Sequence, residues 1–217
     1  MELLNDEDVR VLGSLAEKEL TTPENYPLSL NALTNACNQV SNRDPVVEYD
    51  EATVKAAVDR LRKYSLVRSI QRADARVMKY MHLMGDALNF DRPEIAVMCV
   101  LMLRGPQTVG EIRTRTARLF DFQSLENVEA TLNALAARTP SPLVARLGRQ
   151  AGQKEARFAH LLSGEVSVVA SAAPAPATPS VRDEPDRLEL LEKTIESLRS
   201  EVAELREKVG ELKRLLE

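Results

Sequence analysis

Proline and capping residues divide residues 20–67 into short segments, and this stretch restricts the fold more than any other part of the chain. Pro23 and Pro27 end any helix that arrives before them, because proline lacks a backbone N–H and clashes with the preceding turn. Ser29 and Asp50 each precede apolar residues at steps of three and four, as helix N-caps do. Residues 41–45, SNRDP, favour a turn. The sequence therefore predicts a short helix, a turn, an amphipathic helix and a strand, which form the middle of a winged helix-turn-helix.

Two long motifs in the same stretch carry a resemblance to a known family. Residues 20–39 read LTTPENYPLSLNALTNACNQ, and residues 41–62 read SNRDPVVEYDEATVKAAVDRLR. They resemble the YceH-like family of uncharacterised bacterial proteins with tandem winged helices, and the resemblance covers roughly residues 5–162. It implies a fold of two successive winged-helix domains. It implies no activity and transfers no catalytic residue to this chain.

An internal repeat points to the same architecture. Three segments match three later segments in spacing and in order: residues 30–33, 54–61 and 79–83 match residues 109–112, 128–135 and 157–161. Such matches predict two copies of one domain, each of about 80 residues and large enough for a modest core of its own. We therefore expect a mainly α fold with small β-hairpin wings (α+β). The expected parts are a first winged-helix domain at 1–84, a short join at 85–91 and a second winged-helix domain at 92–162.

The C-terminal part has a different composition. Residues 163–185 are rich in Ala and Pro without an apolar period, which predicts a semi-extended linker. Residues 186–217 carry apolar side chains at alternating steps of three and four, which predicts a coiled-coil helix and favours a parallel dimer. The alternative is a solitary amphipathic helix that docks on the rest of the chain. The residues expected to mediate dimerisation are Leu188, Leu191, Ile195, Leu198, Val202, Leu205, Val209, Leu212 and Leu216.

Positive charge is concentrated in the second repeat. Residues 91–164 carry 10 basic and 7 acidic side chains, net +3, whereas residues 1–84 carry 11 and 13, net −2. Basic side chains can bind the phosphates of duplex DNA without reading its sequence, although an ordinary solvated face would look the same. The candidate DNA contacts are Arg43, Lys55, Arg62, Lys63, Arg113, Arg115, Arg118, Arg146, Arg149, Lys154 and Arg157.

Both predicted recognition helices begin near carboxylates, which repel phosphate at the place where base-reading residues usually lie. Asp50 and Glu51 lie at the start of the first helix, and Glu126 lies at the start of the second. Arg43, in the turn before the first helix, is the best-placed cation of the first domain. Its alternative role is to hold that turn by bonding to the backbone or to Asp44. We therefore expect weak, largely sequence-independent binding to DNA.

These patterns favour a non-enzymatic, regulator-like DNA-binding protein in the cytoplasm. The alternative is a protein-interaction scaffold, such as a subunit of a chromosome-organising complex, that binds a protein partner. No nucleophile–base pair, metal-ligand cluster or glycine-rich phosphate loop is visible, so we expect no cofactor, metal or small-molecule substrate. Cys37 and Cys99 lie on apolar helix faces and are expected to be buried free thiols. His82 and His160 occupy equivalent positions of the repeat and are expected to be structural. We expect neither a signal peptide nor a membrane span.

Overall fold

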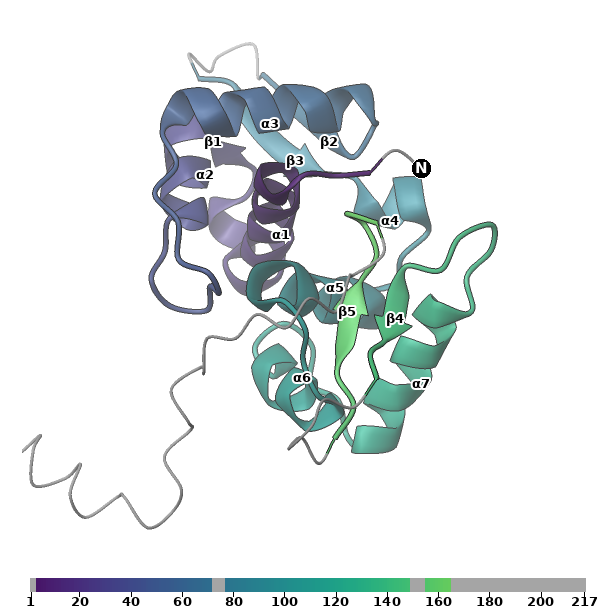
Figure 1. Cartoon of the computed structure of the whole chain (residues 1–217). Helices are drawn as coiled ribbons and strands as arrows, with labels where there is room; N and C mark the ends of the chain where they lie inside the picture. Colours follow the sequence, from purple (N-terminus) through teal and green to yellow (C-terminus); the bar gives the residue numbers. More distant parts are fainter. Residues whose placement is uncertain (1–2, 72–76, 149–154, 165–217) are drawn as a thin grey trace, which may run out of the picture. The chain divides into compact units, whose positions relative to one another are not determined.

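The computed structural model describes residues 3–71, 77–148 and 155–164, which form a mainly helical α+β fold with two small antiparallel sheets (Figure 1). Residues 72–76 and 149–154, which fall in the two predicted hairpin wings, lie outside the described residues. So do the predicted linker and coiled coil from residue 165 onward, including all of the predicted dimerisation residues.

The first half of the fold begins with a helix and ends with a hairpin. Its elements are α1 (Asp6–Thr21), η1 (Pro23–Asn25), β1 (Leu28–Ser29), α2 (Leu30–Cys37), α3 (Glu51–Lys63), β2 (Val67–Ile70) and β3 (Lys79–His82). Strand β3 lies between β1 and β2, with Leu28 opposite Tyr80 and Val67 opposite His82. Strand β1 is a finding that sequence could not supply, because two residues are too few to display a strand period.

The second half begins with a short helix. Its elements are α4 (Met84–Leu88), α5 (Arg92–Arg104), α6 (Val109–Thr116), α7 (Leu125–Ala136), β4 (Val144–Arg146) and β5 (Phe158–His160). Helix α4 occupies much of the segment predicted as a join. Strand β5 pairs with β4 over three residues, with Val144 opposite His160 and Arg146 opposite Phe158.

The backbone pairing of the two halves is related. Leu28 pairs with Tyr80 in the first half, and Gln107 forms an isolated bridge with Phe158 in the second. Gln107 N donates to Phe158 O at 2.9 Å, and Phe158 N donates to Gln107 O at 2.7 Å. Leu28 lies two residues before the start of α2, and Gln107 lies two residues before the start of α6. The repeat seen in the sequence is therefore repeated in the hydrogen bonding.

Helix starts agree with the sequence-based predictions. The predicted N-caps Ser29 and Asp50 each accept a hydrogen bond from the backbone N–H of the third residue of the helix. Thr108 and Ser124 cap α6 and α7 in the same way. Asn5 and Asp91 cap α1 and α5 in the same way, each within a capping box. Such caps stabilise a helix by about 1 kcal/mol each, because they satisfy N–H groups that have no intrahelical partner.

Helices α1 and α5 pack against each other at the centre of the fold. In Figure 1, α1 lies between α3 and α5. Every residue of α1 from Asp8 to Glu17 is buried, as is every residue of α5 from Glu94 to Leu103. Residues 95–103 of α5 read IAVMCVLML, and a helix that is apolar on all sides becomes buried on all sides. One continuous hydrophobic core therefore spans both halves, where the sequence had suggested two modest cores.

Helices α1 and α5 approach each other closely at Gly13. A Cβ atom added there would lie 2.9 Å from Leu103 Cδ2 and 3.2 Å from Met102 Cβ, closer than such atoms normally approach. The Sγ atom of Cys99 lies 3.6 Å from the carbonyl oxygen of Gly13. Glycine is thus the residue that lets α1 and α5 come together.

The beginning and the end of the described fold are joined by a backbone hydrogen bond. Leu4 N donates to Leu162 O at 2.8 Å. The side chain of Leu3 also approaches Gly164, where an added Cβ would lie 3.3 Å from Leu3 Cδ1. The segment before α1 is therefore held by the segment that follows β5.

Candidate functional site

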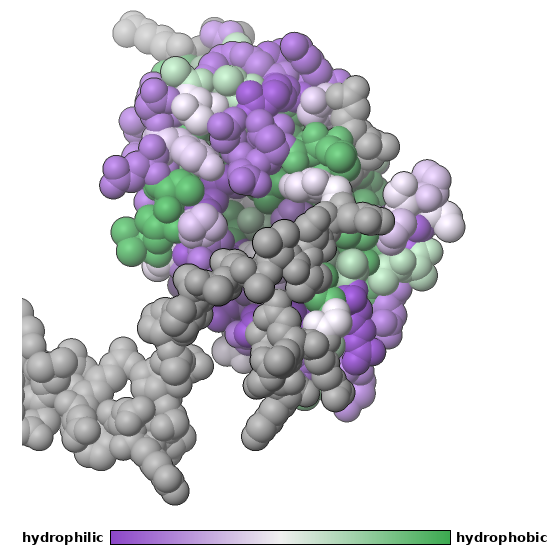
Figure 2. Space-filling view, viewed as in Figure 1, coloured by the Kyte–Doolittle hydropathy of each residue, from purple (hydrophilic) through white to green (hydrophobic). Residues whose placement is uncertain are grey.

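Three of the four cations predicted to contact DNA from the first half share one face of α3. Arg62 and Lys63 follow Lys55 by seven and eight residues, which is about two helical turns, so the three side chains lie on the same side of the helix. Figure 2 shows hydrophilic residues gathered over α3. Lys55 forms a close ion pair with Asp59, and Arg62 Nη1 lies 3.4 Å from Asp59 Oδ1. The hydrogen bond from Lys55 lowers the pKa of Asp59, and the single negative charge of this carboxylate is shared between Lys55 and Arg62.

Arg43 does not face solvent, which corrects its predicted role as a DNA contact. Its side chain is fully buried, and its two terminal nitrogens lie 3.1 and 2.7 Å from the carboxylate oxygens of Glu17 on α1. Its Nη2 also donates to the carbonyl oxygen of Ala36 at 2.7 Å. Arg43 therefore attaches the turn before α3 to α1 and is unavailable to a phosphate.

Two cations of the second half are paired with one carboxylate. Glu111, on α6, accepts a hydrogen bond from Arg157 Nη1 at 2.9 Å and lies 3.8 Å from Arg115 Nη2. Its Oε2 atom also accepts the backbone N–H of Thr108 at 2.8 Å in the capping box of α6. Arg115 and Arg157 are therefore partly neutralised by Glu111.

Three other cations of the second half have no carboxylate partner within the described residues. Arg113 donates to the carbonyl oxygens of Phe122 and Gln123 at 3.3 and 3.2 Å, so it supports the loop before α7 and keeps its charge. Arg118 and Arg146 are exposed and carry no ion pair with the residues that the structure describes. Arg149 and Lys154 lie outside those residues.

Helix α7, which corresponds to α3 in the repeat, has a different exposed face. Its sequence, LENVEATLNALA, contains neither Lys nor Arg. Its exposed positions include Glu126, Glu129, Ala130 and Asn133. Because phosphate attraction requires positive charge, α7 itself adds nothing to the affinity of the second half for a polyanion.

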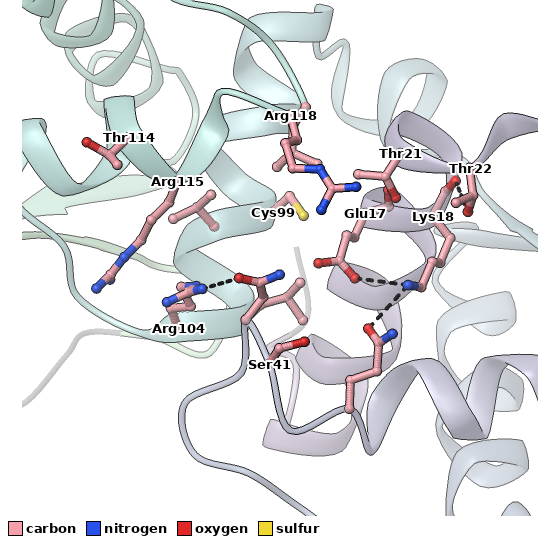
Figure 3. Close-up of a pocket in the computed structure, with 15 residues that line it drawn as sticks. Glu17, Lys18, Thr21, Thr22, Ser41, Cys99, Arg104, Thr114, Arg115 and Arg118 are labelled. Atoms are coloured by element: carbon pink, nitrogen blue, oxygen red, sulfur yellow. Dashed lines mark hydrogen bonds and ion pairs between the residues drawn. The ribbon is translucent and has the colours of Figure 1, made fainter. Parts of the chain in front are cut away.

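A polar pocket of about 470 Å³ lies where the two halves meet. The first half contributes side chains from α1 and from the segment after α2, and the second half contributes side chains from α5, α6 and the turn after α6. Figure 3 shows Arg118 extending toward Glu17 and Lys18 on α1. The lining residues that carry charge are Glu17, Lys18, Arg104, Arg115 and Arg118.

Positive charge dominates this pocket. Glu17 is its one carboxylate among the described residues, and the buried Arg43 already neutralises it. Lys18 Nζ donates to Gln39 Oε1 at 3.2 Å and lies 3.7 Å from Glu17 Oε2, and Arg104 bonds to Asn42 Oδ1, so both cations are held in place by neighbouring polar groups. Burial lowers the pKa of Arg104, and the nearby charge of Arg115 lowers it further.

The sequence missed Lys18 and Arg104 as candidate functional residues. Each stands near the C-terminus of a helix, where a cation is an ordinary means of balancing the helix dipole. Nothing in their spacing along the chain relates the two. They come together only because α1 packs on α5, and that contact has no local sequence signal.

The two histidines lie in equivalent strands and have different surroundings. His82 Nδ1 accepts the backbone N–H of Met84 at 3.2 Å, and His82 Nε2 lies 2.5 Å from Glu19 Oε2. His160 Nδ1 is buried without a hydrogen-bond partner among the described residues, and burial lowers the pKa of His160 to about 4.

The cysteine prediction is confirmed. Cys37 and Cys99 are both buried and free. Burial raises the pKa of Cys37 to about 11 and also raises that of Cys99, which makes both poor nucleophiles. Within the described residues, no group of three or more His, Cys, Asp or Glu side chains is placed to hold a metal ion. None of the helices in those ranges has the length and apolar character that a membrane crossing requires.

Comparison with known proteins places the chain among bacterial sequences. Residues 4–153 match a family described as "Protein of unknown function, DUF480". A UPF0502 protein of Opitutus terrae is 53% identical over 197 residues, which cover 91% of this chain and 84% of that protein. A UPF0502 protein of Pelobacter propionicus is 52% identical over 216 residues, or 97% of each chain. One from Aliivibrio fischeri is 44% identical over 220 residues, covering 100% of this chain and 97% of the relative.

Proposed function

This chain belongs to the DUF480 family, whose description assigns no function, so we propose a function from the architecture of the chain itself. It is a non-enzymatic, cytoplasmic protein with tandem winged helices that binds duplex DNA weakly through phosphate contacts. The order of elements supports the winged-helix arrangement. In each half, a long helix is followed by a short extended segment that pairs with the later hairpin, then by two helices and the hairpin itself.

The observation that carries the DNA proposal is the state of the cations in the second half. Arg113, Arg118 and Arg146 project their charge from α6, the following turn and β4, and none has a carboxylate partner among the described residues. Phosphate contacts from such residues supply affinity without reading bases. Helix α7 contains no Lys or Arg, which also favours binding that does not depend on the DNA sequence.

The test is a polarisation titration with a labelled random-sequence duplex at several salt concentrations. Phosphate contacts release counterions, so log affinity should fall linearly with log salt, with a slope of roughly −3 per subunit if three or four cations engage. Replacing Arg146 and Arg149 with alanine should flatten the slope by up to ~2 and weaken all sequences alike.

Lys55→Ala is the matched control, because Asp59 already offsets the charge of Lys55. It should change the slope less than the pair of wing substitutions does. An absence of binding at low salt would remove the DNA proposal. A strong preference for one sequence, lost on changing Glu51 or Lys55, would show instead that the protein reads bases directly.

A second candidate is a protein-interaction scaffold, which one feature favours. The exposed face of α7 combines two carboxylates with alanine and asparagine, a surface that repels DNA and permits close packing with another protein. In either case, we propose that the C-terminal coiled coil joins two copies in parallel. A dimer would strengthen a weak contact through effective concentration.

A further inference from the structure

We propose that the pocket between the two halves binds a small phosphate ester whose body carries hydroxyl groups. The pocket shares Arg115 and Arg118 with the candidate DNA contacts, whereas its other lining side chains are not among those contacts. Its volume, about 470 Å³, lies within the range of about 300–1,000 Å³ that is typical of small-molecule sites.

The anionic part of the ligand follows from the arrangement of charge. Lys18 and Arg118 face each other across the pocket in Figure 3, and Arg104 and Arg115 lie close enough for one charge to affect the pKa of the other. The buried Arg43 neutralises Glu17, the carboxylate of the lining. Several cations brought together at one surface are stabilised by a bound oxyanion, and guanidinium groups suit phosphate geometry.

The hydroxyl-bearing part follows from the polar groups around those cations. Thr21 Oγ1 and Thr22 Oγ1 donate to the carbonyl oxygens of Glu17 and Lys18 at 2.8 and 3.2 Å. Because their protons are thus engaged, these hydroxyl oxygens remain able to accept hydrogen bonds from a ligand. The cations act as donors to phosphate, and the threonines act as acceptors for ligand hydroxyl groups.

The rest of the lining limits the ligand body further. Val100, Leu103 and Leu119 form an apolar part of the surface. None of the lining residues is aromatic, so the pocket offers no ring on which a nucleobase could stack. These features favour a sugar phosphate over a nucleotide.

Binding is measured by isothermal titration of the full chain with glucose 6-phosphate, inorganic phosphate, glucose and AMP at constant ionic strength. Glucose 6-phosphate should bind most tightly, phosphate and AMP more weakly, and glucose undetectably. Arg118→Gln removes a charge that has no ion pair within the described residues, so its thermal stability should match that of the parent protein. Affinity for glucose 6-phosphate should fall roughly tenfold, as the loss of one charged hydrogen bond predicts.

Arg146→Gln is the matched control, since it removes an exposed guanidinium that does not line the pocket. Its affinity should equal that of the parent protein. Arg115→Gln, a second pocket variant, should weaken binding as Arg118→Gln does. Equal losses at Arg118 and Arg146, the absence of saturable binding, or affinity for glucose 6-phosphate no greater than for phosphate would each overturn the proposal. Loss of duplex binding alone would contradict the proposed function and leave this site intact.

Discussion

Single residues decide how this fold responds to pH, and His160 is the clearest example. Its buried Nδ1 has no partner among the described residues, and burial depresses its pKa to about 4. In the unfolded chain, the pKa of histidine is about 6.5, so between these values the unfolded state binds more protons. The stabilising contribution is therefore complete above pH 6.5 and is lost as the pH falls toward 4.

We expect this histidine to make the protein less stable in mild acid. Between pH 8 and pH 5, its protonation in the unfolded state should lower the free energy of unfolding by up to about 2 kcal/mol. The His160→Leu variant has no titrating group at this position. Its free energy of unfolding should therefore fall by up to about 2 kcal/mol less than that of the parent protein between pH 8 and pH 5. Urea denaturation at both pH values measures the difference. An identical pH dependence in the two proteins would mean that His160 does not titrate on unfolding.

Residues that act locally could be predicted from sequence, whereas those that act through distant partners could not. Ser29 and Asp50 were identifiable as caps because a cap and its helix lie within four residues. For Arg43, the sequence leaves open a DNA contact and a role in holding its turn, because its partner Glu17 is far away in the chain. The same limit hid the meeting of Lys18 and Arg104 at the pocket. Sequence patterns at short range therefore predicted the elements but not the candidate ligand site.

At the scale of elements, the crossing of α1 and α5 determines how the halves fit together. Sequence periodicity identifies both helices. It does not show that they bury each other, since an apolar pattern does not specify which element packs against it. The crossing depends on the missing Cβ of Gly13, which faces Leu103 and Met102. Gly110, in α6, provides a contrast because an added Cβ there would meet nothing within 4 Å.

Substitution of these two glycines should have opposite effects. Gly13→Val forces apart two packed helices and should destabilise the protein by about 1–3 kcal/mol, as overpacking does. Gly110→Ala adds a better helix former in open space and should be neutral or stabilising by up to ~1 kcal/mol. Chemical denaturation of both variants measures the contrast. Tolerance of valine at position 13 would show that the helices can separate without cost.

At the scale of the whole molecule, the two halves share one core, and the proposed coiled coil would join two such molecules. Val202 and Val209 flank Leu205 in the predicted seam, so a lysine at position 205 would place a charge between apolar side chains. Leu205→Lys should therefore convert a dimer into monomers in sedimentation experiments. If the variant and the parent protein are both dimers, the association lies elsewhere, and if both are monomers, the predicted helix does not pair.

The hydrogen bond between Leu4 and Leu162 has a consequence for the connectivity of the chain. Since the ends of the described fold lie together, a short peptide linking residue 164 to residue 3 would close it into a ring. New termini opened between α4 and α5 would then place the second half before the first in a circular permutant, with the same contacts available to each helix. The order in which the halves are synthesised is thus separable from the way they pack, and a label fused before residue 3 would lie close to Gly164.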